Sequence, residues 1–316
     1  MKKFRIGVDV GGTNIKIALV DTQGNISYSN SLPTRAEMGY EYTIANMKQA
    51  IADLMKETKT TKDNIEGIGF GFPGQIDYKN GIVRLAPNIP GWVNVPISEV
   101  MEKEFGIPTR VDNDVRCATL GELNFGAGKG CDNLVCITVG TGIGSGLVIN
   151  GKLVRGASNA AGELGHIKLQ MNGGPLCGCG DFGCLEAFAS GPSIVAMAEE
   201  YIKGGKSTKY RELANPDITP YIVSEAAKQG DAVAQRIFAI VGEYIGIGLA
   251  SVVNLLNPEK IIIGGGVADA GDILLNPIKE EINKRAMSIS ASAVEIVPAQ
   301  LGNTAGVIGA SMLIKS

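Results

Sequence analysis

The sequence predicts an α/β protein made of two β-rich α/β domains that flank a cleft. Its 316 residues are enough for about two domains. Short apolar runs that end in glycine alternate with segments of helical periodicity, a pattern typical of sheets covered by helices. The order strand, glycine turn, strand occurs at residues 4–20 and again at 134–149, which indicates two similar halves. The repeat is too weak in sequence to establish a duplication.

The first half begins with two predicted strands joined by a tight turn. Residues 4–10 form a buried apolar run, Gly11 and Gly12 reverse the chain, and residues 15–20 return. Apolar residues then recur at helical spacing over 44–55. The other elements expected in this half are strands at 26–29, 65–72 and 107–111 and a helix at 115–125.

The second half repeats this beginning and then becomes mostly helical. Strands are expected at 134–139 and 147–149, on either side of a glycine-rich turn at 140–146, and Gly151 starts a return strand. The remaining elements expected are helices within 187–258, including a long one at 232–256, a strand at 261–263, a helix at 273–285, a strand at 294–297 and a helix at 305–314.

Composition excludes several classes of function. The net charge is -3 and no Lys/Arg run stands out, so a nucleic-acid surface is not indicated. No stretch reaches the roughly 18 uninterrupted apolar residues of a membrane span, and the chain leads into a strand containing Asp9 instead of a signal peptide. We therefore expect a cytoplasmic protein that binds neither nucleic acid nor membrane. Its cysteines should be thiols or metal ligands, and Cys117, Cys131 and Cys136 small buried hydrophobes.

A metal site is the most specific feature of the sequence. Cys177, Cys179 and Cys184 form a C-x-C-x4-C pattern, and His166, the single histidine, lies just upstream. Three thiolates and an imidazole make a closed tetrahedral set, so the predicted Zn²⁺ is structural. The alternative is three unpaired cysteines and a hydrogen-bonded histidine, but intervening glycines supply the bends that a short chelate loop needs.

Two glycine turns predict phosphate binding. In the first, a strand ends at Asp9 and turns through Gly11 and Gly12 to Thr13, where backbone N–H groups can form an anion-binding concavity and the carboxylate can hold Mg²⁺. The alternative is a plain hairpin. The second, at 140–146, leads into a strand and not a helix, which disfavours a Rossmann dinucleotide site and favours a phosphate clamp.

A third glycine turn and an acidic strand end complete the candidate residues. The glycines at 264–266 could lie against an adenine or ribose, or could serve close packing of a strand and a helix. Asp114 is the predicted general base, Asn113 the partner of a neighbouring hydroxyl, and Asp112 an orienting group. The alternative role for one of the acids is to cap the helix that starts at Val115.

Taken together, these motifs resemble the ROK family (repressor, ORF, kinase), and specifically its bacterial glucokinase branch. The resemblance spans nearly the whole chain, and its most specific element is the segment at 162–186 with its G-E-L-G-H and C-G-C-G-D-F-G-C-L-E motifs. It implies an actin-like ATPase (ribonuclease H-like) fold. The smaller domain would comprise 1–113 plus 302–316 and the larger one 114–301.

The resemblance also implies an ATP:hexose 6-phosphotransferase that uses Mg²⁺ and has Asp114 as its base. Family members are usually dimers or tetramers, so a homodimer or homotetramer is expected. The residues expected to contact the sugar are Gly74, Asn113, Asp114, Glu163, His166 and Glu186. The residues expected at ATP are Asp9, Gly11, Gly12, Thr13, Asn14, Gly140, Thr141, Gly142, Gly144, Gly265 and Gly266.

The chain departs from the family pattern at two positions. Arg116 follows the predicted base closely and would be either a solvated helix residue or a perturbing charge, while Ser145 stands where a glycine is usual. The segment at 86–92 looks like the kinase branch, where it lies near the sugar pocket.

Several functions stay open at this stage. The sugar could be glucose, N-acetylmannosamine, N-acetylglucosamine or fructose, and the donor ATP or polyphosphate. A sugar-responsive regulator is disfavoured because the first strand starts at Phe4, which leaves no room for a winged helix-turn-helix before it. An actin-like ATPase acting on protein partners would leave the metal motif unexplained.

Overall fold

The computed structural model describes residues 3–87, 89–214 and 217–315 and divides the chain into two compact units. Residue 88 of the 86–92 segment, and residues 1, 2 and 316 of the expected smaller domain, lie outside the described residues. Unit 1 contains residues 1–130, 146–161 and 300–316, and unit 2 contains 131–145 and 162–299. Unit 1 therefore includes the helix after Asn113, which was expected in the larger domain.

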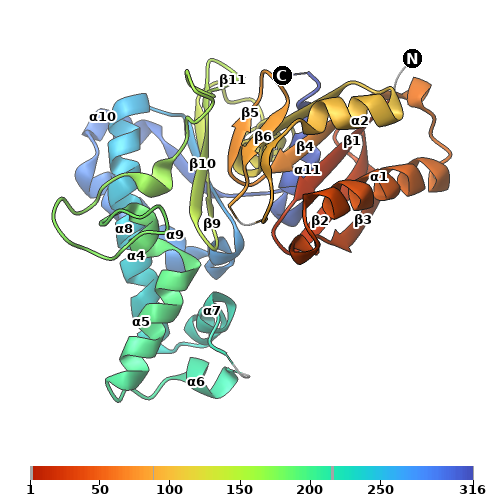
Figure 1. Cartoon of the computed structure of the whole chain (residues 1–316). Helices are drawn as coiled ribbons and strands as arrows, with labels where there is room; N and C mark the ends of the chain where they lie inside the picture. The colour runs from red at the N-terminus through yellow and green to blue at the C-terminus, as the bar shows by residue number, and fades with distance from the viewer. Residues whose placement is uncertain (1–2, 88, 215–216, 316) are drawn as a thin grey trace. The chain divides into compact units, whose positions relative to one another are not determined.

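Unit 1 is built on a five-stranded mixed sheet with the order β3-β2-β1-β4-β8 (Figure 1). Strands β1 and β2 are antiparallel neighbours, as are β2 and β3, whereas β4 runs parallel to both β1 and β8. The bounds are β1 Phe4–Val10, β2 Asn14–Asp21, β3 Ile26–Pro33, β4 Ile65–Phe72 and β8 Thr109–Asn113. A small sheet of β5 (Gln75–Asp77), β6 (Ile82–Leu85) and β7 (Val93–Val95) follows β4.

Two helices cover one face of the unit 1 sheet. Alternate residues of β1 and β2, such as Val8 and Ile17, share one buried cluster with Ile51 of α1 (Tyr40–Glu57) and Met101 of α2 (Ile97–Phe105). Trp92 completes this core, fully buried, with its ring 4.5 Å from that of Phe72. The tryptophan of the 86–92 segment is thus a packing residue.

The other face of this sheet holds α11 (Ala305–Met312) and α3 (Asp114–Phe125). Glycines let these backbones approach closely. A Cβ on Gly7 of β1 would lie 1.9 Å from the carbonyl oxygen of Val307, and one on Gly309 would lie 1.6 Å from that of Cys117. Part of the high glycine content of this chain therefore serves helix packing.

Strands β9, β12 and β13 of unit 2 belong to a second five-stranded sheet, with the order β11-β10-β9-β12-β13. This order repeats that of the first sheet, with parallel pairing of β9 to β12 and of β12 to β13. The bounds are β9 Leu134–Val139, β10 Ile143–Ile149, β11 Lys152–Leu153, β12 Lys260–Gly264 and β13 Glu295–Pro298. The expected α/β class and repeated strand–turn–strand order are confirmed.

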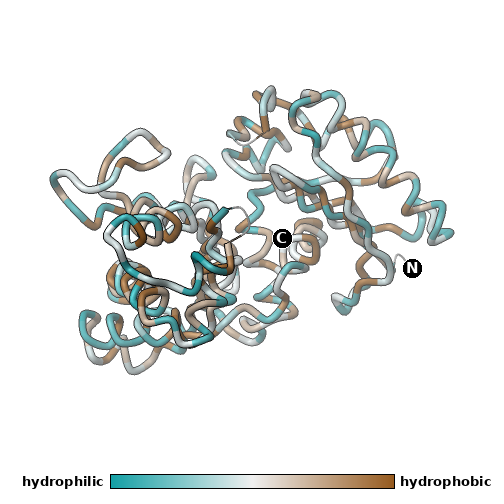
Figure 2. Tube along the Cα trace, turned by 90° about the horizontal axis from the view of Figure 1, so that it is seen from below, coloured by the Kyte–Doolittle hydropathy of each residue, from teal (hydrophilic) through white to brown (hydrophobic). Residues whose placement is uncertain are grey.

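Helices form the rest of unit 2. The central helix α8 (Ala232–Leu256) packs closely on α9 (Asp272–Arg285), because Gly242 and Gly246 let the backbones approach. The other helices are α4 Leu185–Ala189, α5 Gly191–Lys203, α6 Lys209–Leu213, α7 Pro220–Lys228 and α10 Ser288–Ala293. Figure 2 shows apolar residues recurring at short intervals among polar ones along the trace, as expected of elements that bury one face.

Helix α8 is long and apolar enough to cross a membrane by length and composition alone. It also packs against α4, α5, α7 and α9, and its residues Ile237, Val241 and Leu249 are completely buried. The same composition is typical of the central helix of a globular unit.

Three expectations need correction. Strand β8 begins and ends two residues later than expected, because Asp112 and Asn113 continue the ladder to β4. Strand β10 begins at Ile143, so Gly144 and Ser145 lie in the strand and not in the turn. Cys117 and Cys136 are buried as expected, but Cys131 is only half-buried.

Candidate active site and metal site

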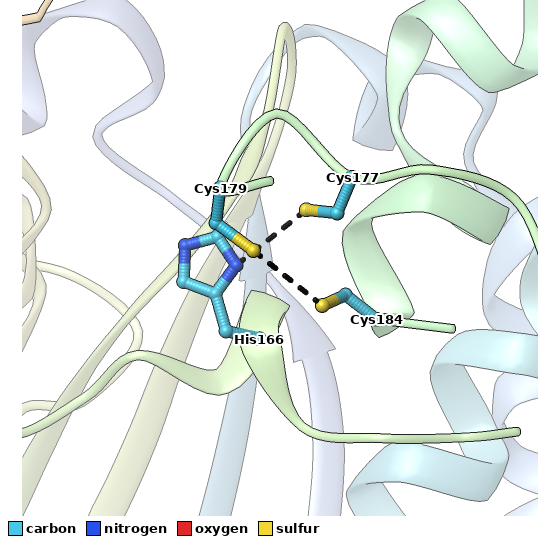
Figure 3. Close-up of side chains that lie close together, drawn as sticks. All are labelled: His166, Cys177, Cys179 and Cys184. Atoms are coloured by element: carbon cyan, nitrogen blue, oxygen red, sulfur yellow. Dashed lines mark hydrogen bonds between the residues drawn. The ribbon is translucent and has the colours of Figure 1, made fainter. Parts of the chain in front are cut away.

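The four predicted metal ligands of unit 2 converge on one point. His166 ends the short 3₁₀ helix η3 (Leu164–His166), and the three cysteines come from the loop that leads into α4. Their ligand atoms all lie within 4.8 Å of one another, and Figure 3 shows the four side chains pointing together. The sulfurs of Cys179 and Cys184 are 3.8 Å apart, close to the roughly 3.8 Å edge of a tetrahedron with Zn–S bonds of about 2.3 Å. The donor set and its spacing fit zinc.

Glycines shape the loop that carries the cysteines, which we call the metal loop (residues 167–184). Gly180 and Gly183 have φ values of 90° and 74°, which other residues adopt only with strain. A Cβ on Gly183 would lie 2.4 Å from the carbonyl oxygen of Gln170. The backbone N–H of Cys177 donates to the Asp181 carbonyl at 2.8 Å, and that of Gly180 to the Cys177 carbonyl at 2.9 Å. The sharp bends that chelation requires are therefore built into the backbone.

The charge around this cluster suits a bound cation. Burial raises the pKa of the Cys177 thiol to about 12, which a divalent cation would counteract by favouring the thiolate. The Nδ1 atom of His166 lies 3.7 Å from the Cys177 sulfur, which leaves Nε2 for another partner. The Lys168 ammonium donates to the Cys184 sulfur at 3.1 Å and pairs with Asp181 at 2.7 Å. Sequence reasoning missed Lys168, whose positive charge would offset the net negative charge of three thiolates bound to one divalent cation.

Glu186 connects the metal cluster to the second glycine turn. One of its carboxylate oxygens accepts the Ile143 N–H at 2.9 Å, and the other lies 3.6 Å from the Cys177 sulfur. A Cβ on Gly142 would meet this carboxylate at 2.4 Å, so the glycine makes room for it. The turn is also tied to the start of α5, since the Gly191 N–H donates to the Gly140 carbonyl at 2.7 Å. Thr141, between these anchors, is exposed.

Ser145, which departs from the family pattern, ties strand β10 to the segment that holds Glu163. Its hydroxyl donates to the Gly162 carbonyl at 2.7 Å. Gly162 has a φ of 97°, and a Cβ there would lie 2.4 Å from the Ser145 carbonyl oxygen. Glu163 comes next and is exposed. Thus Gly144, Glu163, His166 and Glu186 belong to one connected region of unit 2.

The third glycine turn serves packing at one residue and is open at the next. A Cβ on Gly265 would lie 2.4 Å from the Val139 carbonyl oxygen at the end of β9. Nothing lies within 4 Å of the corresponding position on Gly266, which is exposed. Both interpretations of this turn are therefore compatible with its geometry.

The first glycine turn of unit 1 connects β1 to β2. Gly12 and Thr13 are exposed at its tip, and Asn14 begins β2. The Gly11 N–H donates to the Asn14 carbonyl at 2.9 Å, and the buried Thr34 hydroxyl donates to the Gly11 carbonyl at 2.7 Å. Thr34 had no signal in the sequence, because nothing local marks its contact with a turn over twenty residues away.

Two carboxylates of unit 1, Asp9 and Asp114, have raised pKa values. Asp9 ends β1, and its pKa is raised to about 6, chiefly by burial and further by the negative charge of Asp114. Burial likewise raises the pKa of Asp114, in the first turn of α3. Gly71 of β4 is paired with Asp9 of β1 on one side and on the other with Asp112 of β8, two residues before Asp114. Paired, raised carboxylate pKa values are typical of sites that handle protons or cations.

Asn113 caps helix α3, where one of the neighbouring acids was the expected cap. Its side-chain oxygen accepts the N–H groups of Val115 at 3.0 Å and Arg116 at 3.2 Å. Its amide nitrogen donates to the Gly74 carbonyl at 3.4 Å, so two residues expected at the sugar lie together. Gly74 has a φ of 97°. The Asp114 carboxylate in turn accepts the Val115 N–H at 2.9 Å.

Comparison with known proteins identifies the family. The ROK family pattern matches residues 5–316. The glucokinase of Halalkalibacterium halodurans is 40% identical over 99% of this chain and 95% of its own. A ROK family glucokinase from Streptomyces griseus, solved with glucose and AMPPNP, has a TM-score of 0.83 and 36% identity, covering 98% of both chains. A ROK family transcriptional regulator homologous to the E. coli Mlc protein has a TM-score of 0.90 and 27% identity, covering all of this chain and 78% of its own.

The chain belongs to the ROK family. The duplicated strand order and these structural relatives establish the actin-like ATPase fold expected from the motifs. The family includes both kinases and regulators, so the site chemistry must discriminate between them.

Proposed function

We propose that this protein is a cytoplasmic ATP-dependent hexose kinase that phosphorylates the 6-hydroxyl of glucose. The observation that carries the proposal is the similarity, over nearly the full length of both chains, to a ROK glucokinase solved with glucose and an ATP analogue. The residues that resemble the family's sugar and phosphate motifs are all present. The cytoplasmic location and the homodimeric or homotetrameric state belong to the same proposal.

In the proposed mechanism, Asp114 accepts the proton of the 6-hydroxyl as its oxygen attacks the γ-phosphorus of ATP. The bond from phosphorus to the β,γ-bridging oxygen breaks, and ADP leaves. The raised pKa of Asp114 strengthens it as a base. Asn113, Glu163, His166 and Glu186 bind the other hydroxyls and fix the acceptor for in-line attack.

The phosphates are assigned to the glycine turns. Backbone N–H groups at Gly12 and Thr13 and at Thr141 and Gly142 donate to phosphate oxygens, and Thr13 and Thr141 add hydroxyl donors. Gly265 and Gly266 would lie beside the nucleoside. Mg²⁺, when bound with ATP, neutralises phosphate charge, and Asp9 is the carboxylate assigned to it, directly or through water.

The zinc set is assigned a structural role. With all four positions taken by protein ligands, a bound zinc has no open site for substrate. His166 is held through Nδ1, so that its Nε2 can contact a sugar hydroxyl. Glu186 is held at the same time by the Ile143 N–H.

A hexose panel tests the proposal. Purified protein with ATP and Mg²⁺ should release ADP with glucose, and 6-deoxyglucose, which lacks the acceptor hydroxyl, should support none. N-acetylmannosamine, N-acetylglucosamine and fructose, each assayed alone, identify an alternative acceptor. Replacing ATP by polyphosphate tests the donor. ADP release that is equal with glucose and 6-deoxyglucose would rule out phosphorylation at position 6.

A sugar-responsive regulator is the second candidate, favoured by the TM-score of 0.90 to a ROK transcriptional regulator. It predicts hexose binding in calorimetry without ADP release for any sugar. The kinase proposal predicts both binding and turnover.

A further inference from the structure

Asp112, just before the predicted base, is a fully buried carboxylate held by two arginines. One oxygen accepts Arg116 Nε at 2.7 Å, and the other accepts Arg155 Nε at 2.7 Å. The first oxygen also accepts the N–H of Asn113 at 2.8 Å. We call Asp112, Arg116 and Arg155 the arginine bridge. All three belong to unit 1.

Each arginine reaches beyond Asp112 to a different segment. Arg116 Nη1 donates to the carbonyl of Asn159 at 2.9 Å. The guanidinium of Arg155 lies over the ring of Tyr78, 3.6 Å from its centre. Tyr78 follows Gly74 by four residues, and Asn159 precedes Glu163 by four. The bridge therefore holds one segment that lies close in sequence to Gly74 and another that lies close to Glu163, and both of these residues are assigned to the sugar.

Arg116 is not the solvated helix residue that its sequence position allowed, since only 3% of it is exposed. Burying three charges is costly, and apolar residues of the same volume are often equally stable or more so. Stability alone thus gives little reason for such a cluster. The positive charge of Arg116 also lowers the pKa of Asp114, which opposes the effect of burial on that carboxylate.

We propose that Arg116 and Arg155 are positioning residues for the acceptor sugar, acting through Asp112 on the backbone beside Gly74, Asn113 and Glu163. This inference rests on the proposed hexose binding but not on the identity of the hexose. It gives a functional role to Arg116, one of the two positions at which the chain departs from the family pattern. The nucleotide turn after Asp9 is held by contacts of its own, with Asn14 and Thr34, so we expect nucleotide affinity to be independent of the arginine bridge.

The test compares Arg116→Met and Arg155→Met with the wild type, with both substrates varied. Each loses one charge-assisted hydrogen bond to Asp112, so hexose KM should rise about tenfold while the KM for ATP changes less than about twofold. Arg116→Lys keeps the charge, but a single ammonium cannot reproduce the two-sided guanidinium contact. Its hexose KM should also rise, which distinguishes the effect of guanidinium geometry from the effect of positive charge alone. Arg116→Lys also serves as a second variant in case Arg116→Met does not fold.

Arg5→Met is the matched control. It breaks another ion pair of unit 1, between the buried Arg5 and the half-buried Glu66 at 2.6 Å, at the start of β4 and not at the end that leads to Gly74. It should lower the melting temperature as the bridge variants do and leave both KM values unchanged. A purely structural bridge would make Arg116→Met and Arg155→Met behave like this control, and that result overturns the inference.

The failure of the two proposals can be distinguished. If the wild type binds a hexose without phosphorylating it, the kinase proposal fails, and the calorimetric hexose Kd takes the place of KM with the same expected tenfold change. If the wild type binds no hexose at all, the inference fails together with the proposed function.

Discussion

Asp114 combines two properties expected of a general base, since it starts a helix at the end of a sheet strand and burial raises its pKa. Asp114→Asn keeps an oxygen to accept the Val115 N–H but removes the proton acceptor. We expect the fold and hexose affinity to persist while turnover falls on the order of 10²–10⁴. Steady-state kinetics and circular dichroism measure this, with the exposed Asp132→Asn as control. Turnover near the wild-type value would remove Asp114 from its assigned role.

Asp9 provides a pH-dependent prediction. Its pKa rises from 3.8 to about 6 on folding, so the folded state holds a proton that the unfolded chain releases between these values. This group's favourable contribution to stability is present below about pH 4 and is lost as pH rises through about 6. At pH 7.5 the charged carboxylate therefore costs up to about 3 kcal/mol.

Asp9→Asn should then raise the melting temperature of the ligand-free protein by a few degrees at pH 7.5, with the gain vanishing below about pH 4. The same variant should bind ATP–Mg²⁺ more weakly. Differential scanning calorimetry across pH makes the measurement, with the exposed Asp63→Asn as reference. A melting temperature below that of the wild type at pH 7.5 contradicts the assignment.

At the scale of secondary-structure elements, the metal loop is expected to link zinc binding to hexose binding. Cys179→Ser removes one of four ligands, so stoichiometric zinc and hexose affinity should fall together, the latter at least about tenfold. Elemental analysis and calorimetry on the same preparations show whether they do. Cys131→Ser, outside the cluster, should keep both. Zinc loss with unchanged hexose affinity would show that the metal does not organise the sugar residues.

The packing of α11 depends on glycine. Gly309→Ala would place a Cβ 1.6 Å from the Cys117 carbonyl oxygen, so α3 and α11 must separate. We expect a loss of about 1–3 kcal/mol or more in unfolding free energy, measured by urea denaturation. Gly204→Ala, whose added Cβ would be 3.4 Å from its nearest neighbour, is the control. Equal stability of the two variants would contradict this packing.

Strands and helices with strong local patterns were predictable. Local sequence alone indicates the buried apolar runs of β1, β4, β9 and β12. It also indicates the helical periodicity of α1, α8 and α9. The small β5-β6-β7 sheet was not expected, because its strands have only three or four residues. The shift of β8 has the same origin, since polar Asp112 and Asn113 look like a strand end until their partners on β4 are known.

The candidate site was likewise predictable in part from the sequence. The metal ligands were predictable because they are close in sequence and chemically distinctive. The four ligands cluster in the structure as expected, and Asn113 and Gly74, both expected at the sugar, are joined by a hydrogen bond that the sequence did not predict. The arginine bridge could not be predicted, because Asp112 and Arg155 are 43 residues apart and nothing in either local sequence marks the other.

For the whole molecule, substrate binding should change its dimensions. The proposed reaction requires groups from both units, and kinases exclude water by closing around their substrates. Hexose with a non-hydrolysable ATP analogue should therefore reduce the radius of gyration in small-angle X-ray scattering. The analogue with 6-deoxyglucose should do the same, since closure needs no acceptor hydroxyl. An unchanged radius with both ligands bound would contradict closure.

The chain enters and leaves unit 1 repeatedly, and α11, which fills one face of its sheet, comes from residues 305–312. During synthesis on the ribosome, all five strands of this sheet emerge well before the helix that covers them. Unit 2, complete at residue 299, can finish folding earlier. The region that is translated first is thus the last to reach its native state, and in the interval its uncovered sheet face is a natural target for chaperones.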